Sequence, residues 1–368
     1  MWHPGRQSRR WPISTVLVTG GAGFIGSELA PLLLQAGHHV VAVDVLHPQV
    51  HPHRRRPGRL PTDVELVVAD VTEPATWDDL LPRVTPDVVV HLAAETGTGQ
   101  SLTEATRHAH VNVVGSTALL DALLRHDSVP EQLLLASSRA VYGEGCWRAA
   151  DGAVFSPGPR SHAMLGSGDW DPRGVDGSVA VPLDSRAGQT IPEPTSVYGA
   201  TKLAQEHVFR AWAAASGAAL SVLRLQNVYG PGQSLTNSYT GIVALFARMT
   251  KAGETVELYE DGRVVRDFVH VDDVVRALAA ALARPVPHRL VDVGSGVPTT
   301  ILELAQLLAD LHGAPPPRVS GRFRDGDVRH ASTEVTAMTG DLGVRPEVSL
   351  PVGLQGLSRW IDASTGTP

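Results

Sequence analysis

The sequence predicts an α/β protein built on a doubly wound parallel sheet. Over residues 13–230, short apolar runs rich in Val and Leu alternate with longer segments of helical periodicity. Strands that are covered on both faces have this near-continuous apolar character, and strand–helix alternation is typical of a parallel sheet with helices on both faces. A glycine-rich turn directly after the first apolar run is the third observation, because the first strand of such a sheet meets its helix at a turn of this kind.

Six apolar runs supply the predicted strands. They cover residues 15–19, 39–43, 65–69, 87–91, 132–137 and 220–225. Helical patterns at 24–36 and 107–126, and a helix that begins near Ser196, lie between them. No fixed-period repeat is visible along the chain, which argues against a solenoid.

The remaining segments depart from this pattern. Residues 143–195 are rich in Gly, Pro, Asp and Arg and have no sustained period, so we interpret them as an insertion in the main domain, residues 13–230. Residues 231–368 are expected to form a smaller α+β substrate-binding lobe that ends in a Pro-punctuated tail. Its predicted strands are 256–259 and 290–293, and its predicted helices are 272–283 and 300–312. Residues 1–12 lack the apolar stretch of a signal peptide and are expected to be a disordered leader.

The composition argues for a globular protein and against several function classes. Lys and Arg number 31 against 38 Asp and Glu, and the net charge of −7 disfavours nucleic-acid binding. Hydrophobic residues make up 43% and charged residues 19%, which disfavours disorder. Cys146 is the single cysteine, so no internal disulfide is expected and a reducing, cytoplasmic compartment fits best. No apolar run approaches the ~20 residues that span a bilayer.

The turn after the first predicted strand has the spacing of a dinucleotide-binding motif. Residues 19–27 read TGGAGFIGS, with Gly20, Gly23 and Gly26 spaced G-x-x-G-x-x-G between a strand and a helix. Such glycines let a pyrophosphate approach the backbone and lie at the helix N-terminus. Asp44 ends the second strand, where a carboxylate accepts from the adenosine ribose hydroxyls and repels a 2′-phosphate. The motif therefore predicts a Rossmann domain that prefers NAD to NADP.

Two features near Asp44 leave alternatives open. The three arginines of residues 54–56 could reach a 2′-phosphate, although a solvated loop is the favoured interpretation. Three histidines within residues 47–53 could suggest a metal, but prolines interrupt them and no thiol or acid stands at ligand spacing. We therefore expect NAD and no metal.

With seven motifs in order, the chain from Ile13 to about Trp360 resembles the extended short-chain dehydrogenase/reductase family, and within it the nucleotide-sugar epimerases. The motifs are TGGAGFIGS at 19–27, Asp70-Val71, HLAA at 91–94, SSRAVYG at 137–143, YGATK at 198–202, RLQNVYGPG at 224–232 and RDFVHVDD at 266–273. Segments 46–51, 95–101 and 224–234 and the long insertion are similar to the branch of dTDP-L-rhamnose 4-epimerases. In that branch the insertion carries several cysteines that could hold a zinc. Here it carries only Cys146, so the insertion must be held by packing or be mobile.

The resemblance implies a catalytic serine, tyrosine and lysine. Tyr198 and Lys202 are four apart and so share one face of the predicted helix. Tyr198 would be the base, because a nearby ammonium and the positive nicotinamide ring favour the phenolate. Lys202 would also bind the nicotinamide ribose, and Ser138, at the end of the fifth strand, would donate to the sugar oxygen. Arg139 and Ala140 occupy the positions of an Asp-Glu pair in related 4,6-dehydratases, which argues against dehydration.

The same resemblance assigns the other site residues. NAD contacts are implied for Gly20, Gly23, Phe24, Ile25, Gly26, Asp44, Asp70, Val71, Leu92, Ala93, Ala94, Tyr198 and Lys202. Substrate contacts are implied for Thr96, Asn227, Arg266 and Arg324, with Arg329 as a further candidate. The arginines would serve as forks for the diphosphate of the substrate.

The implied reaction is 4-epimerisation of a dTDP-(6-deoxy)hexose through transient oxidation at C4 by NAD. An NAD(P)H-dependent 4-ketoreductase acting on a dTDP-4-keto-6-deoxyhexose is the alternative, because it would use the same three residues. A non-catalytic nucleotide sensor is disfavoured by the intact Tyr198 and Lys202. Relatives pair two long helices across a two-fold axis, so a homodimer is expected.

The insertion, residues 143–195, is also predicted to act at the sugar site. Both of its ends adjoin catalytic residues, so it is predicted to form a partly ordered lid that shapes hexose selectivity, with Trp147, Phe155 and Trp170 as anchors. The alternative is a surface loop without a role in the site.

Overall fold

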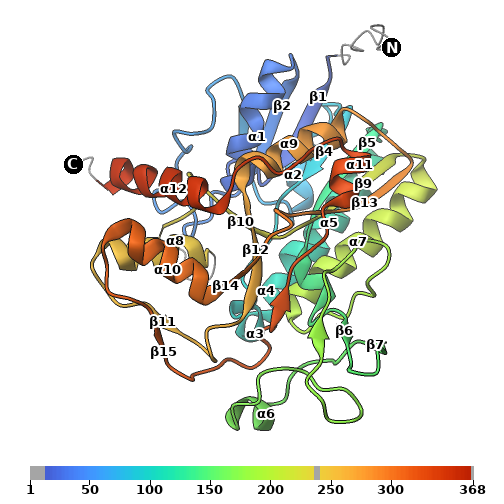
Figure 1. Cartoon of the computed structure of the whole chain (residues 1–368). Coiled ribbons are helices and arrows are strands. Elements are labelled where there is room, and N and C mark those ends of the chain that lie inside the picture. Colours follow the sequence, from blue (N-terminus) through green and yellow to red (C-terminus); the bar gives the residue numbers. More distant parts are fainter. Residues whose placement is uncertain (1–12, 236–240, 366–368) are drawn as a thin grey trace, which may run out of the picture.

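A seven-stranded parallel sheet runs through the computed structural model, which describes residues 13–235 and 241–365 (Figure 1). The strand order is β13-β9-β5-β4-β1-β2-β3, and every neighbouring pair is parallel. The strands are β1 (Thr15–Thr19), β2 (His39–Asp44), β3 (Glu65–Val68), β4 (Val88–His91), β5 (Gln132–Ser138), β9 (Ala219–Leu225) and β13 (His288–Val293). The order reverses between β1 and β4, and the crevice at such a reversal is where doubly wound sheets bind their ligands.

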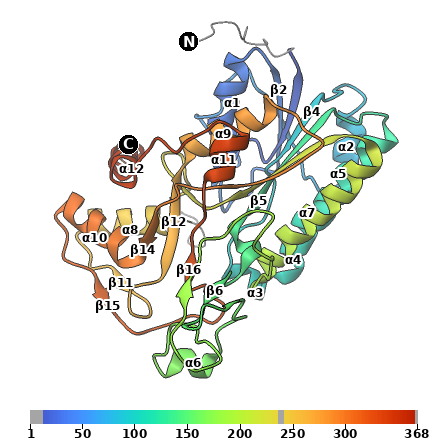
Figure 2. The same cartoon turned by 45° about the vertical axis from the view of Figure 1, so that its right-hand side comes forward.

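Helices cover both faces of this sheet (Figure 2). One face carries α1 (Phe24–Gln35), α9 (Val271–Leu282) and α11 (Thr336–Asp341). The other carries α2 (Pro74–Leu80), α5 (Gly115–Arg125) and α7 (Val197–Ser216). Successive residues of β1 point to opposite faces, so Leu17 packs in the second apolar cluster and Val18 in the first. The predicted doubly wound α/β class is confirmed.

The helix predicted at 107–126 is divided by a π-helical turn. After α3 (Gln100–Thr103), α4 (Ala105–Ala109) passes through the turn His110–Val114 into α5. Asn112 lies in this turn, and its side chain bonds the backbone of Glu95 in both directions, at 2.8 and 3.0 Å, and Oγ1 of Thr201 at 2.9 Å. The turn therefore ties the loop after β4 to α7, two segments that both border the site.

Most of the C-terminal region forms a smaller α+β lobe. Its strands are β10 (Asn227–Tyr229), β12 (Val265–His270), β14 (Pro298–Thr300) and β16 (His330–Ala331), beside a ribbon of β11 (Glu257–Leu258) and β15 (Arg318–Val319). Its helices are α8 (Ile242–Lys251), α10 (Ile301–His312) and α12 (Leu350–Thr365). Their apolar faces meet around Phe246, Phe268 and Leu357.

The lobe does not contain every segment that was expected in it. Residues 272–283 and 290–293 were predicted there, but β13 pairs with β9 along its whole length and α9 packs on α1. These segments complete the large sheet and one of its helix layers, so their placement is corrected. Sequence order alone does not assign a strand to a sheet, because the chain crosses from one sheet to the other after β12.

The insertion has secondary structure of its own. β6 (Trp147–Arg148) pairs with β7 (Val154–Phe155) and β8 (Val181–Pro182), and α6 (His162–Gly166) lies between these strands in the chain. Trp147 is fully buried and its indole N–H donates to the carbonyl of Glu144 at 2.9 Å. The predicted leader, residues 1–12, lies outside the described residues. Within the described ranges, no helix has the length and apolar character required to cross a membrane.

Candidate active site

A cavity of about 290 Å³ lies at the carboxyl ends of β5 and β9. The loop after β4, the first turns of α7 and the start of α8 complete its walls. Predicted site residues that line it are Ile25, Leu92, Ala94, Thr96, Ser138, Tyr198, Lys202 and Asn227. The structure therefore brings the three predicted catalytic side chains together with predicted cofactor and substrate residues.

Ser138 and Tyr198 meet directly in this cavity. Ser138 ends β5, and its hydroxyl lies beside the phenol of Tyr198, close enough to lower the pKa of that phenol. Tyr198 stands in the first turn of α7, where Ser196 caps the helix by accepting from the Gly199 N–H at 3.1 Å. The Tyr198 N–H donates to Oγ of Ser101 at 3.1 Å, which fixes the start of the helix against α3.

The glycine in YGATK makes this approach possible. A Cβ on Gly199 would lie 2.5 Å from the carbonyl oxygen of Ala140, closer than a carbon atom can come. Helix α7 thus touches the backbone turn that follows Ser138. Any side chain at position 199 would push Tyr198 away from Ser138.

The electrostatic surroundings of Tyr198 differ from the prediction in one respect. Burial raises the pKa of the Tyr198 phenol, and two groups oppose that rise: the hydrogen bond from Ser138 and the positive charge of Arg139. Arg139 is thus a further cation that favours the phenolate, and the sequence argument used it only as a sign against dehydration. Burial, and then repulsion by Arg266, lowers the pKa of Arg139 to about 9, so it is still charged near neutral pH.

Lys202 lies one turn after Tyr198 and is fully buried. Burial lowers the pKa of its ammonium to about 8, against the opposing charge of Glu206. Glu206 itself forms a buried ion pair with Arg224 at 2.7 Å and accepts from Ser137. Ser137, the neighbour of the catalytic serine, therefore has a structural partner on α7.

His91 of the HLAA motif is a structural residue of this centre. Its ring bonds Thr19 Oγ1 at 2.8 Å and Ser116 Oγ at 3.0 Å, and it lies fully buried behind Lys202. Burial, and then the charge of Lys202, lowers the pKa of the imidazole to about 3. His91 is therefore neutral near pH 7, and its hydrogen bonds give it a structural role.

The glycine-rich turn is shaped to hold a pyrophosphate. No side chain caps the first turn of α1, whose N-cap is Gly23, so the amides at this helix end are left for a bound anion. A Cβ on Gly26 would lie 2.6 Å from the carbonyl of Gly21, so only glycine lets the helix start this close to the turn. These residues fit a dinucleotide.

Asp44 ends β2 beside the glycine-rich turn. Its carboxylate accepts from the Ala22 N–H at 3.1 Å and the Leu46 N–H at 2.9 Å, which joins the glycine-rich turn to the end of β2. The arginines of residues 54–56 were the reason to keep NADP as an alternative. Of these, Arg56 donates to the carbonyls of Pro61 and Val64 and so stabilises the loop to which it belongs.

Replacing Asp44 by alanine should weaken NAD binding and relax the discrimination against NADP, because the carboxylate that repels a 2′-phosphate is lost. Titration of both dinucleotides against wild type and Asp44→Ala measures the two Kd values. Asp63→Ala, at an exposed carboxylate of the neighbouring loop, is the control. A wild-type protein that binds NADP more tightly than NAD contradicts the expectation.

The other predicted cofactor residues border the same crevice. Asp70 accepts from the N–H and hydroxyl of Thr72, and Val71 is buried in the core below it. The Ala93 N–H donates to Thr19 Oγ1 at 3.2 Å, between the two cavity-lining residues Leu92 and Ala94.

The predicted substrate residues are divided between the cavity and the lobe. Thr96 and Asn227 line the cavity, and the buried Oδ1 of Asn227 has no partner among the described residues. Arg266 is buried and donates to the carbonyl of Val328 at 2.8 Å. Arg324 is exposed and stacks 4.9 Å from the ring centre of Tyr259, outside the cavity lining.

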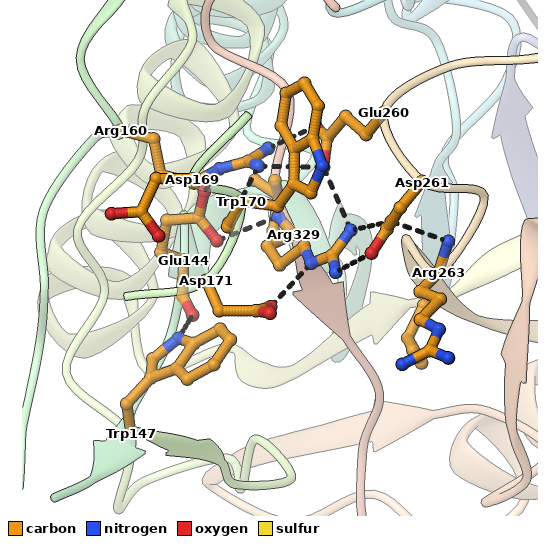
Figure 3. Close-up of polar contacts among 12 residues, drawn as sticks. Glu144, Trp147, Arg160, Asp169, Trp170, Asp171, Glu260, Asp261, Arg263 and Arg329 are labelled. Carbon is orange, nitrogen blue, oxygen red and sulfur yellow. Dashed lines mark hydrogen bonds and ion pairs between the residues drawn. The ribbon is translucent and has the colours of Figure 1, made fainter. Parts of the chain in front are cut away.

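Arg329 belongs to a buried ionic cluster that anchors the insertion (Figure 3). Its guanidinium pairs with Asp171 at 2.7 Å, Glu260 at 3.0 Å and Asp261 at 2.6 Å, so its donors are already used. Three carboxylates from two distant segments thus engage it. This removes the reason to assign it to the substrate.

Arg160 is the second cation of this cluster. It pairs with Glu144 at 2.9 Å and with Glu260 at 2.8 Å, and all three side chains are 2% exposed. Glu144 also accepts from the backbone N–H of Arg329 at 2.9 Å. Burial raises the pKa of the Glu144 carboxyl, against the opposing charge of Arg160. The insertion is therefore held by packing and by ion pairs.

The predicted anchors of the insertion contribute unequally. Trp147 is buried, Trp170 accepts from Arg160 through its carbonyl and lies 6.3 Å from the ring of Phe323, and Phe155 is half-buried opposite Trp147. Among the described residues that line the cavity, none belongs to 143–195. Figure 2 shows the insertion at one end of the molecule, below the lobe and α3.

Sequence reasoning did not single out three polar residues of the cavity as substrate contacts. They are Arg139, Gln226 and Gln233. The carboxamide oxygens of Gln226 and Gln233 are buried and have no partner among the described residues. Arg139 directly follows β5, Gln226 directly follows β9, and Gln233 lies in a later loop. These positions could have indicated a substrate contact, because the strand ends form the ligand crevice.

A doubly wound sheet, an open glycine-rich helix start and an adjacent Ser–Tyr pair with a lysine one turn on define a dinucleotide-dependent enzyme of the short-chain dehydrogenase/reductase type. The model of the NAD dependent epimerase/dehydratase family matches residues 16–294. A dTDP-L-rhamnose 4-epimerase of Burkholderia thailandensis is 55% identical over 347 residues, which are 94% of each chain. The chain belongs to this NAD-dependent family, its cofactor is NAD, and the resemblance inferred from the motifs is confirmed.

Solved structures agree with this assignment. The UDP-glucose 4-epimerase of Thermotoga maritima with UDP-glucose is similar with a TM-score of 0.77 at 28% identity, over 95% of this chain and 99% of that one. The UDP-glucose 4-epimerase of Thermus thermophilus with NAD is similar with a TM-score of 0.75 at 27% identity, over the same shares.

Proposed function

We propose that this protein is an NAD-dependent 4-epimerase of a dTDP-6-deoxyhexose. The observation that carries the proposal is that Ser138, Tyr198 and Lys202 line one cavity together with predicted cofactor and substrate residues. The identity of 55% to a dTDP-L-rhamnose 4-epimerase supports the substrate class. Asn227 and the forks of Arg266 and Arg324 are proposed to hold the substrate, with its diphosphate on the arginines.

In the proposed mechanism, Tyr198 removes the proton of the sugar C4 hydroxyl. Ser138 bonds the same oxygen and keeps it within reach of the phenolate, while the charge of Arg139 stabilises that phenolate. Bound NAD would supply the acceptor for the C4 hydride and the donor for its return. When the 4-keto sugar has turned its other face, Tyr198 gives its proton back to the C4 oxygen and the stereocentre is inverted.

The neighbouring residues favour epimerisation over water elimination. Elimination of water needs an acid and a base beside the sugar, in addition to the pair that serves C4. Arg139 and Ala140 follow Ser138 directly, and neither can fill that role as a carboxylate would. The side of the cavity next to Ser138 thus offers a cation where a dehydratase would need an acid.

The second candidate is a 4-ketoreductase that consumes a reduced cofactor. Arg54 and Arg55 favour it, because they are exposed near the end of β2 and could meet a 2′-phosphate. Asp44 opposes it. Incubation of purified protein with a dTDP-6-deoxyhexose tests both: interconversion of the C4 epimers without net cofactor use supports the epimerase. Conversion of the 4-keto sugar only with stoichiometric NADPH oxidation supports the reductase.

We also propose that the protein is a cytoplasmic homodimer. Helices α5 and α7 lie side by side, and Leu124 of α5 and Val114, the last residue of the π-helical turn before it, are exposed, as a helix-pairing surface requires. Light scattering at micromolar concentration should give twice the chain mass. Leu124→Glu should reduce that mass to one chain, whereas Leu245→Glu, at an exposed leucine of α8, should not. A monomeric wild type contradicts the proposal.

A further inference from the structure

Two neighbouring side chains of the cavity have no partner among the described residues. The guanidinium of Arg139 makes no hydrogen bond or ion pair with any described residue. The Gln226 carboxamide likewise bonds none of them, and its Oε1 is buried. Leaving buried polar groups unpaired costs free energy, so each such group in a folded protein calls for an explanation.

The sheet register places these two residues side by side. Ser138 of β5 pairs with Leu225 of β9, so Arg139 and Gln226 follow from adjacent positions at the same edge of the sheet. Both line the cavity that contains Tyr198. Arg139 lies near enough to lower the pKa of the Tyr198 phenol, so it stands at the sugar end of the cavity.

The position of Gln226 is fixed by its packing. A Cβ on Gly294 would lie 2.9 Å from Cγ of Gln226, so the side chain occupies the space that this glycine leaves. The nearby donors, which are the N–H and hydroxyl of Ser295 and the N–H of Gly296, are bonded to the carboxylate of Asp267. No donor of the described residues on this side of the cavity is thus bonded to the Gln226 oxygen.

The carboxylates around Arg139 do not explain its presence. Asp327 and Glu144 attract it from a distance, and Glu144 is already paired with Arg160 and the backbone of Arg329. Arg266, the other nearby cation, repels it. The charges around Arg139 therefore act on it without direct contact, and its N–H donors are available to a ligand.

A guanidinium only donates hydrogen bonds and a carboxamide oxygen only accepts them, whereas a hydroxyl does both. We propose that Arg139 and Gln226 together bind one sugar hydroxyl, whose oxygen accepts from Arg139 and whose proton is donated to Gln226. The inference rests on the proposed function, which puts the C4 oxygen at Ser138 and Tyr198. In a 6-deoxyhexose the oxygen next to C4 is the C3 hydroxyl, because C5 carries a methyl group and the ring oxygen. The C3 hydroxyl is therefore the ligand of this pair.

The first test needs no variant. Wild-type kcat/KM is measured for the dTDP-6-deoxyhexose and for its 3-deoxy and 2-deoxy analogues. A site built to bond a hydroxyl rejects the analogue that lacks it, so the 3-deoxy sugar should lose at least ~10-fold and the 2-deoxy sugar much less. Equal kcat/KM for the parent and the 3-deoxy sugar overturns the inference, as does a loss confined to the 2-deoxy sugar.

The second test asks whether these two residues sense that hydroxyl. Gln226→Leu should lower kcat/KM on the parent sugar by a similar factor and change it little on the 3-deoxy sugar. Arg139→Met also removes the charge beside Tyr198, so it should lower kcat/KM on both sugars, but the ratio of kcat/KM between the parent and the 3-deoxy sugar should fall as in Gln226→Leu. Gln306→Leu, at an exposed glutamine of α10, should behave as wild type. Bound NAD, released and quantified, shows that each variant keeps its cofactor domain.

The outcomes separate the two proposals. If the wild type interconverts no dTDP-hexose epimers, the proposed function fails. If it does so, and folded NAD-bound variants discriminate against the 3-deoxy sugar as strongly as wild type does, the hydroxyl site alone is overturned.

Discussion

Tyr198→Phe is expected to lower kcat by at least ~10²-fold while the protein stays folded and NAD-bound, because general acid–base groups contribute on the order of 10²–10⁴. The variant keeps the ring that fills the space beside Ser138 and removes only the hydroxyl that exchanges the C4 proton. Turnover of the C4 epimers, thermal unfolding and the content of bound NAD are measured together.

Tyr259→Phe is the matched control for this substitution. Tyr259 belongs to the lobe, outside the cavity lining, and its ring is covered by the Arg324 guanidinium. Loss of its hydroxyl should leave kcat unchanged. Turnover by a folded Tyr198→Phe protein at the wild-type rate would show that the proton passes through another group.

The second large effect concerns stability. Arg160→Met should reduce the free energy of unfolding by roughly 3–5 kcal/mol, because it keeps the stem of the side chain but leaves the buried carboxylates of Glu144 and Glu260 short of a partner. Arg329 still pairs with Glu260, so Glu144 suffers most. Denaturant unfolding followed by fluorescence measures the change, since Trp147 and Trp170 lie beside the cluster.

A companion variant separates unpaired charge from lost packing. Adding Glu144→Gln to Arg160→Met removes the buried charge and should recover part of the loss, whereas Arg173→Met, at an exposed pair in the same insertion, should change little. An Arg160→Met protein as stable as wild type would mean that the cluster does not hold the insertion to the lobe.

The sequence predicted the large sheet well because buried parallel strands have a composition that few other segments share. The strand predicted at 15–19 has the bounds of β1. The strand predicted at 220–225 starts one residue later than β9 and ends at the same residue. Assigning strands to sheets was harder, as β13 shows. The segment that forms α12 was predicted to be a tail because a proline interrupts it. A Cβ on Gly353 would lie 2.1 Å from the Tyr229 hydroxyl, so glycine at this position allows the helix to pack closely against Tyr229.

The candidate site was predictable where a motif carries the chemistry, as for Ser138 and Tyr198. It was less predictable where the role depends on which partner a charged residue meets. Arg329 and Arg139 are both arginines in matching segments, but the first is paired with three carboxylates and the second with no carboxylate of the described residues. The spacing of residues along the chain does not contain that difference.

The ionic anchoring of the insertion has a consequence for the conditions that the enzyme tolerates. Guanidinium–carboxylate pairs are neither oxidised by peroxide nor extracted by chelators, unlike a thiolate-bound zinc. They are also buried, so concentrated salt screens them little. We expect this segment to keep its order under zinc starvation and oxidative stress, and EDTA and hydrogen peroxide to leave its protection from proteolysis unchanged.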